Sequence, residues 1–157
     1  MRVELAHPTV RTFLRRGMVA LVATRSAAGR PFLTPLWFVV HAGVVWVTTG
    51  TATRAARNVA RHPDVTVLIH GETNAAEVAV RLRGRATLRP GLPPWPVLLR
   101  IAVKYYLAPR ALRSEVANVA RWPLRTRYYA SVAGGPGHLA IVPVAAEVVA
   151  RPDRPAE

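Results

Sequence analysis

The segment from residue 34 to residue 68 constrains the fold of this chain more than any other. It holds two apolar runs rich in β-branched and aromatic residues, at 36–40 and 44–48, with His41-Ala42-Gly43 between them. Such runs favour β-strands, and the glycine supplies the residue that a tight turn needs at a positive φ angle. The pattern therefore predicts a β-hairpin, and residues 65–69 predict a further strand downstream.

The loop after this hairpin offers hydroxyl groups at the start of a short helix predicted at 54–61. Residues 48–53 read Thr-Thr-Gly-Thr-Ala-Thr, and Thr53 is placed to cap the helix by accepting a hydrogen bond from a first-turn amide. These amides, the positive end of the helix dipole and Arg54 or Arg57 together suit an anion. Threonines at a helix start are usually only caps, so the spacing alone leaves a structural role and a phosphate site equally open.

Further elements follow along the rest of the chain. A proline near the first turn and Gly17 at the end predict a helix at 8–16. Strands are predicted at 18–24, 32–40, 44–48, 65–69, 77–88 with a kink at Gly84, 127–132 and 139–149. Pro35 requires an edge strand or a bulge. Because strands outnumber strand–helix–strand units, we expect a mainly β fold, a closed or split β-barrel of six to seven strands with short helices.

A proline-rich stretch near residue 90 interrupts the β pattern and opens a helical insertion around residues 93–122. Helices are predicted at 95–107 and 110–121. The first is apolar most of the way round, so we expect other protein to cover it, as a lid or a dimer contact. A helix lying on a membrane surface is the less favoured alternative. The 157 residues suit a single domain over residues 1–150, with the charged, proline-rich residues 151–157 as a loose tail.

The formal net charge of +14 favours anionic partners without choosing among them. Arg81, Arg83, Arg85 and Arg89 stand at alternating positions, which puts all four on one face of a strand. A nucleic-acid-binding module is therefore the competing hypothesis. Against it, the chain contains no helix-turn-helix, zinc-finger or aromatic RNA-binding signature, so we do not expect nucleic acid as a partner.

Other residue types exclude several kinds of site. The chain has no cysteine, which rules out disulfides, thiolate zinc sites and cysteine nucleophiles. Its five histidines are scattered and form no ligand pair at a spacing of four residues, so no metal site is expected. The first residues show no apolar run ahead of a cleavage site, and residues 95–107 are too few to cross a bilayer. We therefore expect a cytoplasmic protein.

Five short motifs, in their order and spacing, resemble the pyridoxamine 5'-phosphate oxidase-like split β-barrel superfamily. They are Gly-x-Pro at 29–31, TPLWF at 34–38, VWVTTG at 45–50, Thr-Arg at 53–54, and Arg-Asn-Val at 57–59 ahead of His62-Pro63. Within the superfamily they are most similar to the actinobacterial flavin and deazaflavin oxidoreductases. The resemblance implies a homodimer with two cofactor sites at its interface. It also implies hydride transfer between coenzyme F420 or FMN and an unknown small organic substrate.

The resemblance further implies which residues hold the cofactor. The ring would lie along Thr34, Pro35, Leu36 and Trp37, and the phosphate would meet Thr48, Thr49, Gly50, Thr53, Arg54 and Arg57. The hydride chemistry belongs to the cofactor, so no dedicated catalytic residue is expected. Of the two cofactors, F420 carries an acidic oligoglutamate tail and suits a basic chain somewhat better than FMN.

The chain departs from the pyridoxamine phosphate oxidases proper in three respects. Ala55 stands where those enzymes carry a phosphate-binding lysine, and Thr34 stands where they carry an arginine. Their C-terminal substrate-binding segment has no evident counterpart. Oxidation of vitamin B6 is therefore not expected, and a phosphate site would depend on Arg54 and Arg57. A family member that binds a cofactor without catalysing a reaction is the alternative to an enzyme.

Overall fold

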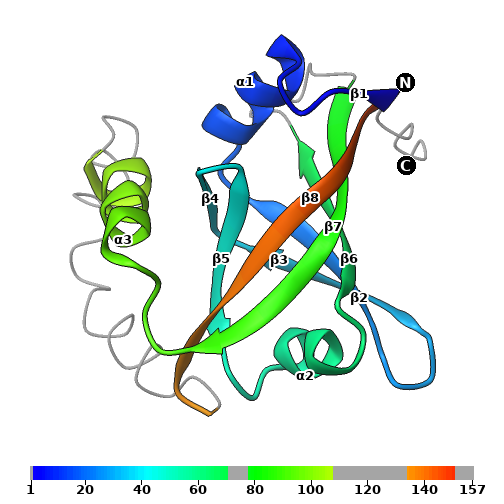
Figure 1. Cartoon of the computed structure of the whole chain (residues 1–157), viewed down its shortest axis with the longest axis vertical. Helices are drawn as coiled ribbons and strands as arrows, with labels where there is room; N and C mark the ends of the chain where they lie inside the picture. Colours follow the sequence, from blue (N-terminus) through cyan, green and yellow to red (C-terminus); the bar gives the residue numbers. More distant parts are fainter. Residues whose placement is uncertain (1, 71–77, 108–133, 151–157) are drawn as a thin grey trace, which may run out of the picture.

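The computed structural model describes residues 2–70, 78–107 and 134–150. The elements in chain order are β1 (Arg2–Val3), α1 (Pro8–Arg16), β2 (Ala20–Arg25), β3 (Pro31–Leu36), β4 (Phe38–His41), β5 (Val44–Gly50), α2 (Arg54–Arg61), β6 (Asp64–His70), β7 (Val78–Pro90), α3 (Trp95–Ala102), the π-helical turn η1 (Val103–Leu107) and β8 (Pro136–Ala150) (Figure 1). The helix predicted at 110–121, the strand predicted at 127–132 and the tail predicted at 151–157 lie outside the described residues.

The strands form one antiparallel sheet that curls on itself. Seven of them follow one another in the order β3-β2-β6-β7-β8-β5-β4, and the two-residue strand β1 adds to β8. β3 and β4 are consecutive in the chain, yet they end opposite sides of this order. The sheet must therefore bend until its two edges meet, which gives the curved shape in Figure 1. The predicted mainly β split barrel is confirmed.

The prediction of one continuous strand at 32–40 is wrong. The chain forms β3, which pairs with β2, and then β4, which pairs with β5, with Trp37 at the joint between them. A single straight strand cannot pair with both ends of the sheet at once, so the backbone breaks where it crosses the split. β3 ends the strand order. Pro35 therefore sits on an edge strand, as predicted, where its missing N–H breaks no ladder.

Two local backbone features follow the sequence closely. In the turn between β4 and β5, Ala42 and Gly43 have φ angles of 51° and 75°, the double positive φ of a tight hairpin turn. In β7 the pairing with β8 shifts register between Arg83 and Gly84. A Cβ atom on Gly84 would lie 2.5 Å from the carbonyl oxygen of Val142, so only glycine allows this close approach. The predicted kink at Gly84 thus lies opposite a β-bulge, whose extra residue is Val144 on β8.

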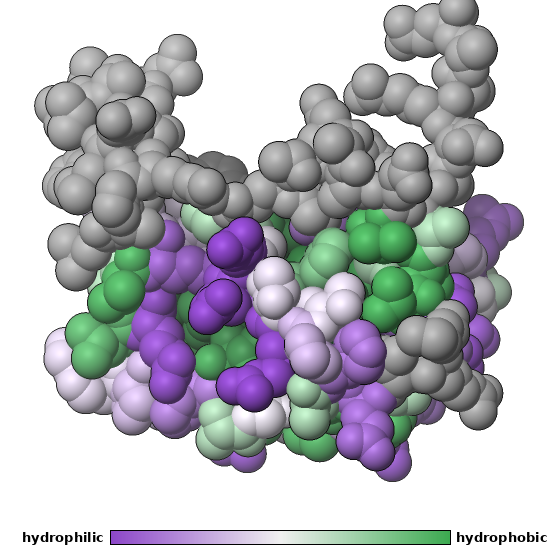
Figure 2. Space-filling model, turned by 90° about the horizontal axis from the view of Figure 1, so that it is seen from above, coloured by the Kyte–Doolittle hydropathy of each residue, from purple (hydrophilic) through white to green (hydrophobic). Residues whose placement is uncertain are grey.

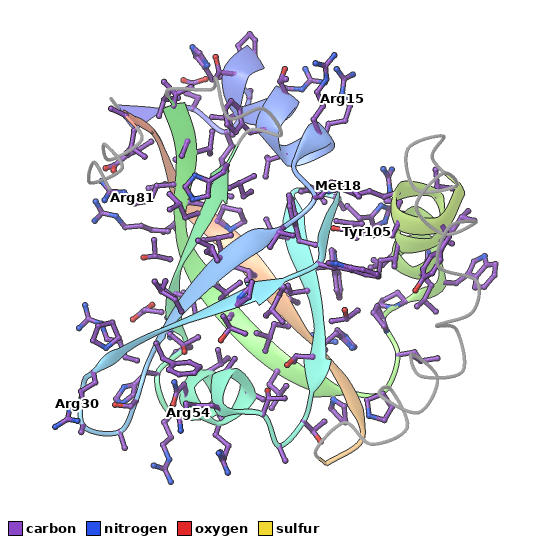
Figure 3. The ribbon with its side chains drawn as sticks, turned by 180° about the vertical axis from the view of Figure 1, so that it is seen from behind. Arg15, Met18, Arg30, Arg54, Arg81 and Tyr105 are labelled. Atoms are coloured by element: carbon purple, nitrogen blue, oxygen red, sulfur yellow. The ribbon has the colours of Figure 1, made fainter. Side chains whose placement is uncertain are left out.

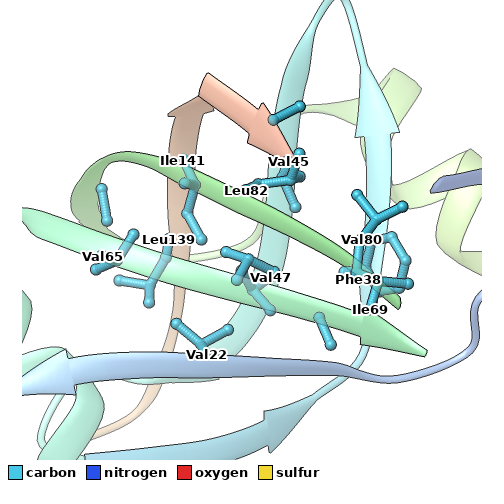
Figure 4. Packing of buried hydrophobic residues seen from close by; sticks show 14 of the residues in the cluster. Val22, Phe38, Val45, Val47, Val65, Ile69, Val80, Leu82, Leu139 and Ile141 are labelled. Atoms are coloured by element: carbon cyan, nitrogen blue, oxygen red, sulfur yellow. The ribbon is translucent and has the colours of Figure 1, made fainter. Parts of the chain in front are cut away.

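The main core fills the inside of the curled sheet. Side chains from β2, β4, β5, β6, β7 and β8 meet there (Figure 4), among them Val22, Phe38, Val47, Val67, Leu82, Leu139 and Ile141, all at most 1% exposed. The helix α1 begins and ends where predicted and adds the buried Val10 to the same cluster. Its outer side is polar, and Figure 2 shows hydrophilic side chains across the middle of the face on which α1 lies.

A second apolar cluster lies outside the barrel, between β4–β5 and the helical insertion. Val39, Val97 and Tyr105 are its buried members. The helix predicted at 95–107 is present as α3 followed by η1. Only one side of it is covered, because Trp95, Leu99 and Val103 are 72%, 50% and 51% exposed. Among the described residues, no helix is long and apolar enough to span a membrane.

Candidate functional site

A cavity of about 550 Å³ lies between α2 and the hairpin that joins β2 to β3. Its lining consists of Ser26, Ala27, Arg30, Pro31, Phe32, Arg54, Arg57, Asn58 and Arg61. Four of these side chains are guanidinium groups and none is a carboxylate. In Figure 3, Arg30 and Arg54 lie at the same end of the molecule, on the hairpin and on the helix. We call this cavity the arginine pocket.

The helix α2 supplies three of the four arginines because of its periodicity. Arg54, Arg57 and Arg61 are three and four residues apart, so they share one helix face. The opposite face is buried through Ala55, Ala56 and Val59. Ala55 is 2% exposed, so neighbouring atoms fill the space that a lysine side chain would need at this position. The pocket therefore draws its positive charge from the exposed face of the helix.

A buried hydrogen bond fixes α2 beneath the pocket. Asn58 is 6% exposed, and its Nδ2 donates to Oγ1 of Thr24 on β2 over 2.9 Å. Thr24 is itself 1% exposed. Neither partner was singled out from the sequence as a site residue. The signal available was a polar asparagine beside the alanines and valine of an otherwise apolar helix face.

The hairpin between β2 and β3 is held by its own hydrogen bonds. The backbone N–H of Ser26 donates to the Arg30 carbonyl over 2.9 Å, and the Arg30 N–H donates to the Ser26 hydroxyl over 3.1 Å. Near the start of β3, the guanidinium carbon of Arg54 lies over the Phe32 ring, 4.6 Å from the ring centroid. A guanidinium stacked in this way keeps its N–H donors at its edge free to bind an anion.

The predicted threonine loop forms a helix cap. Thr53 Oγ1 accepts from the Ala56 N–H over 3.2 Å and donates to the Gly50 carbonyl over 3.0 Å, and it lies 2.9 Å from Thr49 Oγ1. The predicted cap at Thr53 is confirmed. Thr48 and Gly50 belong to β5, opposite residues of β8. Of the predicted phosphate residues, only Arg54 and Arg57 line the arginine pocket.

The four residues predicted to lie along the cofactor ring do not share one environment. Thr34 lies two residues beyond Phe32 on β3, hence on the same face of the strand. Its Oγ1 is buried and, among the described residues, has no hydrogen-bond partner. Pro35 is exposed on the other face of β3, and Leu36 packs against the main core. Trp37 stacks on Tyr105, with ring centroids 4.5 Å apart and planes 5° from parallel.

Tyr105 fastens the insertion to the joint between β3 and β4. Its hydroxyl accepts from the Phe38 N–H over 2.9 Å and lies 2.8 Å from the Met18 carbonyl and 2.9 Å from the Phe38 carbonyl. Burial raises the pKa of this hydroxyl to about 12, against a smaller lowering by the Phe38 backbone. Beside it, Lys104 donates to the Phe38 carbonyl over 3.0 Å. The sequence did not reveal these contacts, which join distant parts of the chain.

Two carboxylates offset part of the charge of the arginine stripe on β7. Arg81 and Arg83 both bind Glu147 on β8, the latter over 3.1 Å, and Arg85 lies 3.7 Å from Asp64. Three of the four predicted stripe residues are therefore ion-paired, which weakens the case for a surface that follows a nucleic-acid backbone. Within residues 2–70, 78–107 and 134–150, no three His, Asp or Glu side chains are grouped closely enough to hold a metal.

Comparison with known proteins identifies the family. The model of the family described as pyridoxamine 5'-phosphate oxidase matches residues 6–133, well over half of the chain. The chain belongs to this family. No curated protein matches the chain significantly. The family match covers most of the sequence, whereas the short motifs lie within residues 29–63.

Solved structures with the same fold differ widely in what their names describe. A putative pyridoxamine 5'-phosphate oxidase from Listeria innocua has a TM-score of 0.59 and 16% identity, over 90% of this chain and 95% of that one. An F420 reductase has a TM-score of 0.61 and 17% identity, over 87% and 94%. HutZ, a heme storage protein from Vibrio cholerae, has a TM-score of 0.62 and 16% identity, over 92% and 93%. At these identities the likeness shows the shared fold alone.

Proposed function

We propose that this protein is an oxidoreductase that uses coenzyme F420 or FMN to transfer a hydride to or from a small organic substrate. The observation that carries the proposal is the arginine pocket, four guanidinium groups without a carboxylate beside the strand that bears Thr34. Family membership supports it, and the F420 reductase of the same fold is consistent with it. Pyridoxamine phosphate oxidation is not proposed, because Ala55 and Thr34 replace the lysine and arginine expected of those enzymes.

The residues of the site fit a phosphorylated aromatic cofactor. Arg54 and Arg57 would bind the phosphate through charge-assisted hydrogen bonds. Phe32 and Thr34 share one face of β3, about 6.6 Å apart along the strand, so the same face runs from the pocket toward the Thr34 hydroxyl. That buried Oγ1 has no partner among the described residues and would bond a polar atom of the ring.

When bound, a flavin or deazaflavin supplies the hydride chemistry, and the chain supplies position and surroundings. Arg54 and Arg57 would fix one end of the cofactor, and Thr34 would orient its ring. Trp37, held flat against Tyr105, would form a rigid apolar wall at the end of β3. We also propose that two copies of the chain form a homodimer with the cofactor sites at the interface, as the family resemblance implies.

The test is direct titration of the purified protein with F420 and with FMN, followed by fluorescence quenching or polarisation. We expect micromolar binding of at least one of them, and F420 to bind somewhat more tightly. Binding of neither at micromolar concentration would overturn the proposal. Turnover of the reduced cofactor with a panel of small organic acceptors then separates an enzyme from a cofactor carrier, and sedimentation with and without cofactor tests the dimer.

A further inference from the structure

The arginine pocket holds more positive charge than one phosphate needs. Two guanidinium groups bound in the bidentate manner already offer four hydrogen bonds to the three free oxygens of a phosphate monoester. Arg54 and Arg57 are sufficient for that role. The pocket lining nevertheless includes Arg30 and Arg61 as well, and no acidic residue balances them there.

The two further arginines come from the end of α2 and from the hairpin between β2 and β3. Arg61 closes α2, seven residues after Arg54, which separates their Cα atoms by about 10 Å along the helix axis. Arg30 comes from the hairpin, and both its backbone N–H and its carbonyl are hydrogen-bonded to Ser26. The arginines that line the pocket therefore come from both ends of α2 and from the hairpin.

The four arginines have no carboxylate partner within the part of the chain that the structure describes. The ion pairs there involve Arg81, Arg83 and Arg85, all on β7. Like charges gathered around one cavity repel one another, and a bound anion removes this cost. A cluster of four without an internal partner is better matched by a ligand with several charges than by a single phosphate.

We propose that the arginine pocket binds a ligand carrying at least two anionic groups, one held by Arg54 and Arg57 and the second by Arg30 and Arg61. This inference rests on the proposed function for the identity of the first group, the cofactor phosphate. It adds that the natural ligand extends along α2 beyond that phosphate. The second group is either a further phosphate or a carboxylate, because both accept bidentate hydrogen bonds from arginine.

The first experiment uses simple anions and requires no cofactor. Inorganic phosphate, pyrophosphate and tripolyphosphate are titrated at constant ionic strength, with binding followed by calorimetry and by the rise in unfolding midpoint. We expect tripolyphosphate to bind at least ten times more tightly than phosphate. In the double variant Arg30→Gln/Arg61→Gln this advantage should shrink to less than threefold, while phosphate binding is kept.

The matched control is Arg11→Gln/Arg15→Gln, which removes the same charge from the exposed side of α1. It should leave all three affinities unchanged within twofold. Equal affinity for the three anions would overturn the proposal, since it would indicate that only one phosphate group is bound. An equal loss in the control variant would also overturn it, since it would indicate attraction to net charge alone. Unfolding midpoints in ligand-free buffer establish that every variant is folded.

A second set of ligands identifies the source of the second group. F420 is compared with F420 lacking its glutamates, and FAD is compared with FMN. A loss of affinity on removing the glutamates, absent in Arg30→Gln/Arg61→Gln, assigns the second group to carboxylates. A preference for FAD over FMN assigns it to a second phosphate. If neither cofactor binds but tripolyphosphate does, the proposed function fails and the polyanion site stands.

Discussion

The arginine pocket and the Trp37–Tyr105 contact are the two most specific parts of this molecule, and they are built in opposite ways. At the first, four cations surround an open cavity with no carboxylate in its lining. At the second, the Tyr105 hydroxyl is 2.8–2.9 Å from three backbone groups, and its ring covers Trp37. Figure 3 shows Arg54 and Tyr105 well apart, on α2 and beside α3.

This difference separates a surface suited to receive a ligand from one that stabilises the fold. A satisfied, buried cluster gains stability from its own contacts, so its loss should lower the free energy of unfolding. An unpaired charged cluster gains nothing from its own members, so its loss should spare stability and reduce ligand binding. Substitutions in the two regions should therefore affect different measurements, the free energy of unfolding in one and ligand affinity in the other.

The largest effect on stability is expected for Tyr105→Leu. The substitution removes the stack on Trp37 and leaves the buried N–H of Phe38 without its acceptor. We expect a loss of about 3 kcal/mol in the free energy of unfolding, measured by urea denaturation. Tyr106→Leu, which loses an edge contact to Trp37 at 6.2 Å and packing beside the second cluster, is the control and should cost less. Equal losses in both variants would contradict the assigned role of the hydroxyl.

The same hydroxyl predicts a loss of stability in strong alkali. The pKa of Tyr105 is about 12 in the folded protein and about 10 when unfolded. The folded state therefore keeps a proton that the unfolded state has lost between these values, and stability falls as the pH rises from 10 to 12. Denaturation followed from pH 9 to pH 12 should show this decline. Tyr105→Phe should show a shallower one, and identical slopes would contradict the prediction.

Arg54→Ala should change ligand binding and leave stability almost unchanged. Arg54 is exposed and contacts Phe32 through a cation–π interaction that is weak in water. Loss of its charge-assisted bonds should weaken cofactor or phosphate binding by roughly 10- to 100-fold. Arg11→Ala, with the same charge change on α1, should have little effect in the same titration. Equal effects in the two variants would place the phosphate elsewhere.

How far the sequence predicts this molecule depends on the distance between the interacting residues. The helices α1 and α2 and the caps at Thr53 and Gly17 depend on neighbours along the chain, and all were predicted within a residue. The break at Trp37 depends on which edges β3 and β4 join, which no local pattern contains. Tyr105 and Phe38 are 67 positions apart, so their hydrogen bond was invisible in the sequence.

The candidate site shows the same limit. Arg54 and Arg57 were predicted because a helix start next to arginines is a local anion-binding pattern. Arg30 lines the pocket because β2 pairs with β6, and this pairing places the hairpin between β2 and β3 beside α2. Thr49 and Thr53 were predicted to bind phosphate, but their hydroxyls already bond one another and the loop. Their role in ligand binding stays a prediction.

The smallest effect, and the one that links the two regions, is expected for Asn58→Leu. Asn58 lines the arginine pocket, yet it is buried and bonded in the manner of the Tyr105 cluster. Its loss removes the donor to Thr24 Oγ1 and leaves that hydroxyl with only its long bond, over 3.4 Å, to the Phe32 carbonyl. This should cost about 1–2 kcal/mol of unfolding free energy. By loosening α2 against β2, it should also lower phosphate affinity a few-fold. Thr24→Val in the same chain removes this weakly bonded hydroxyl and should restore part of the stability. If the double variant recovers stability while phosphate affinity stays low, the hydrogen bond serves to position the arginines. If both recover together, Asn58 only stabilises the fold. The buried residue beneath the arginine pocket then acts like the Tyr105 cluster and not like the arginines.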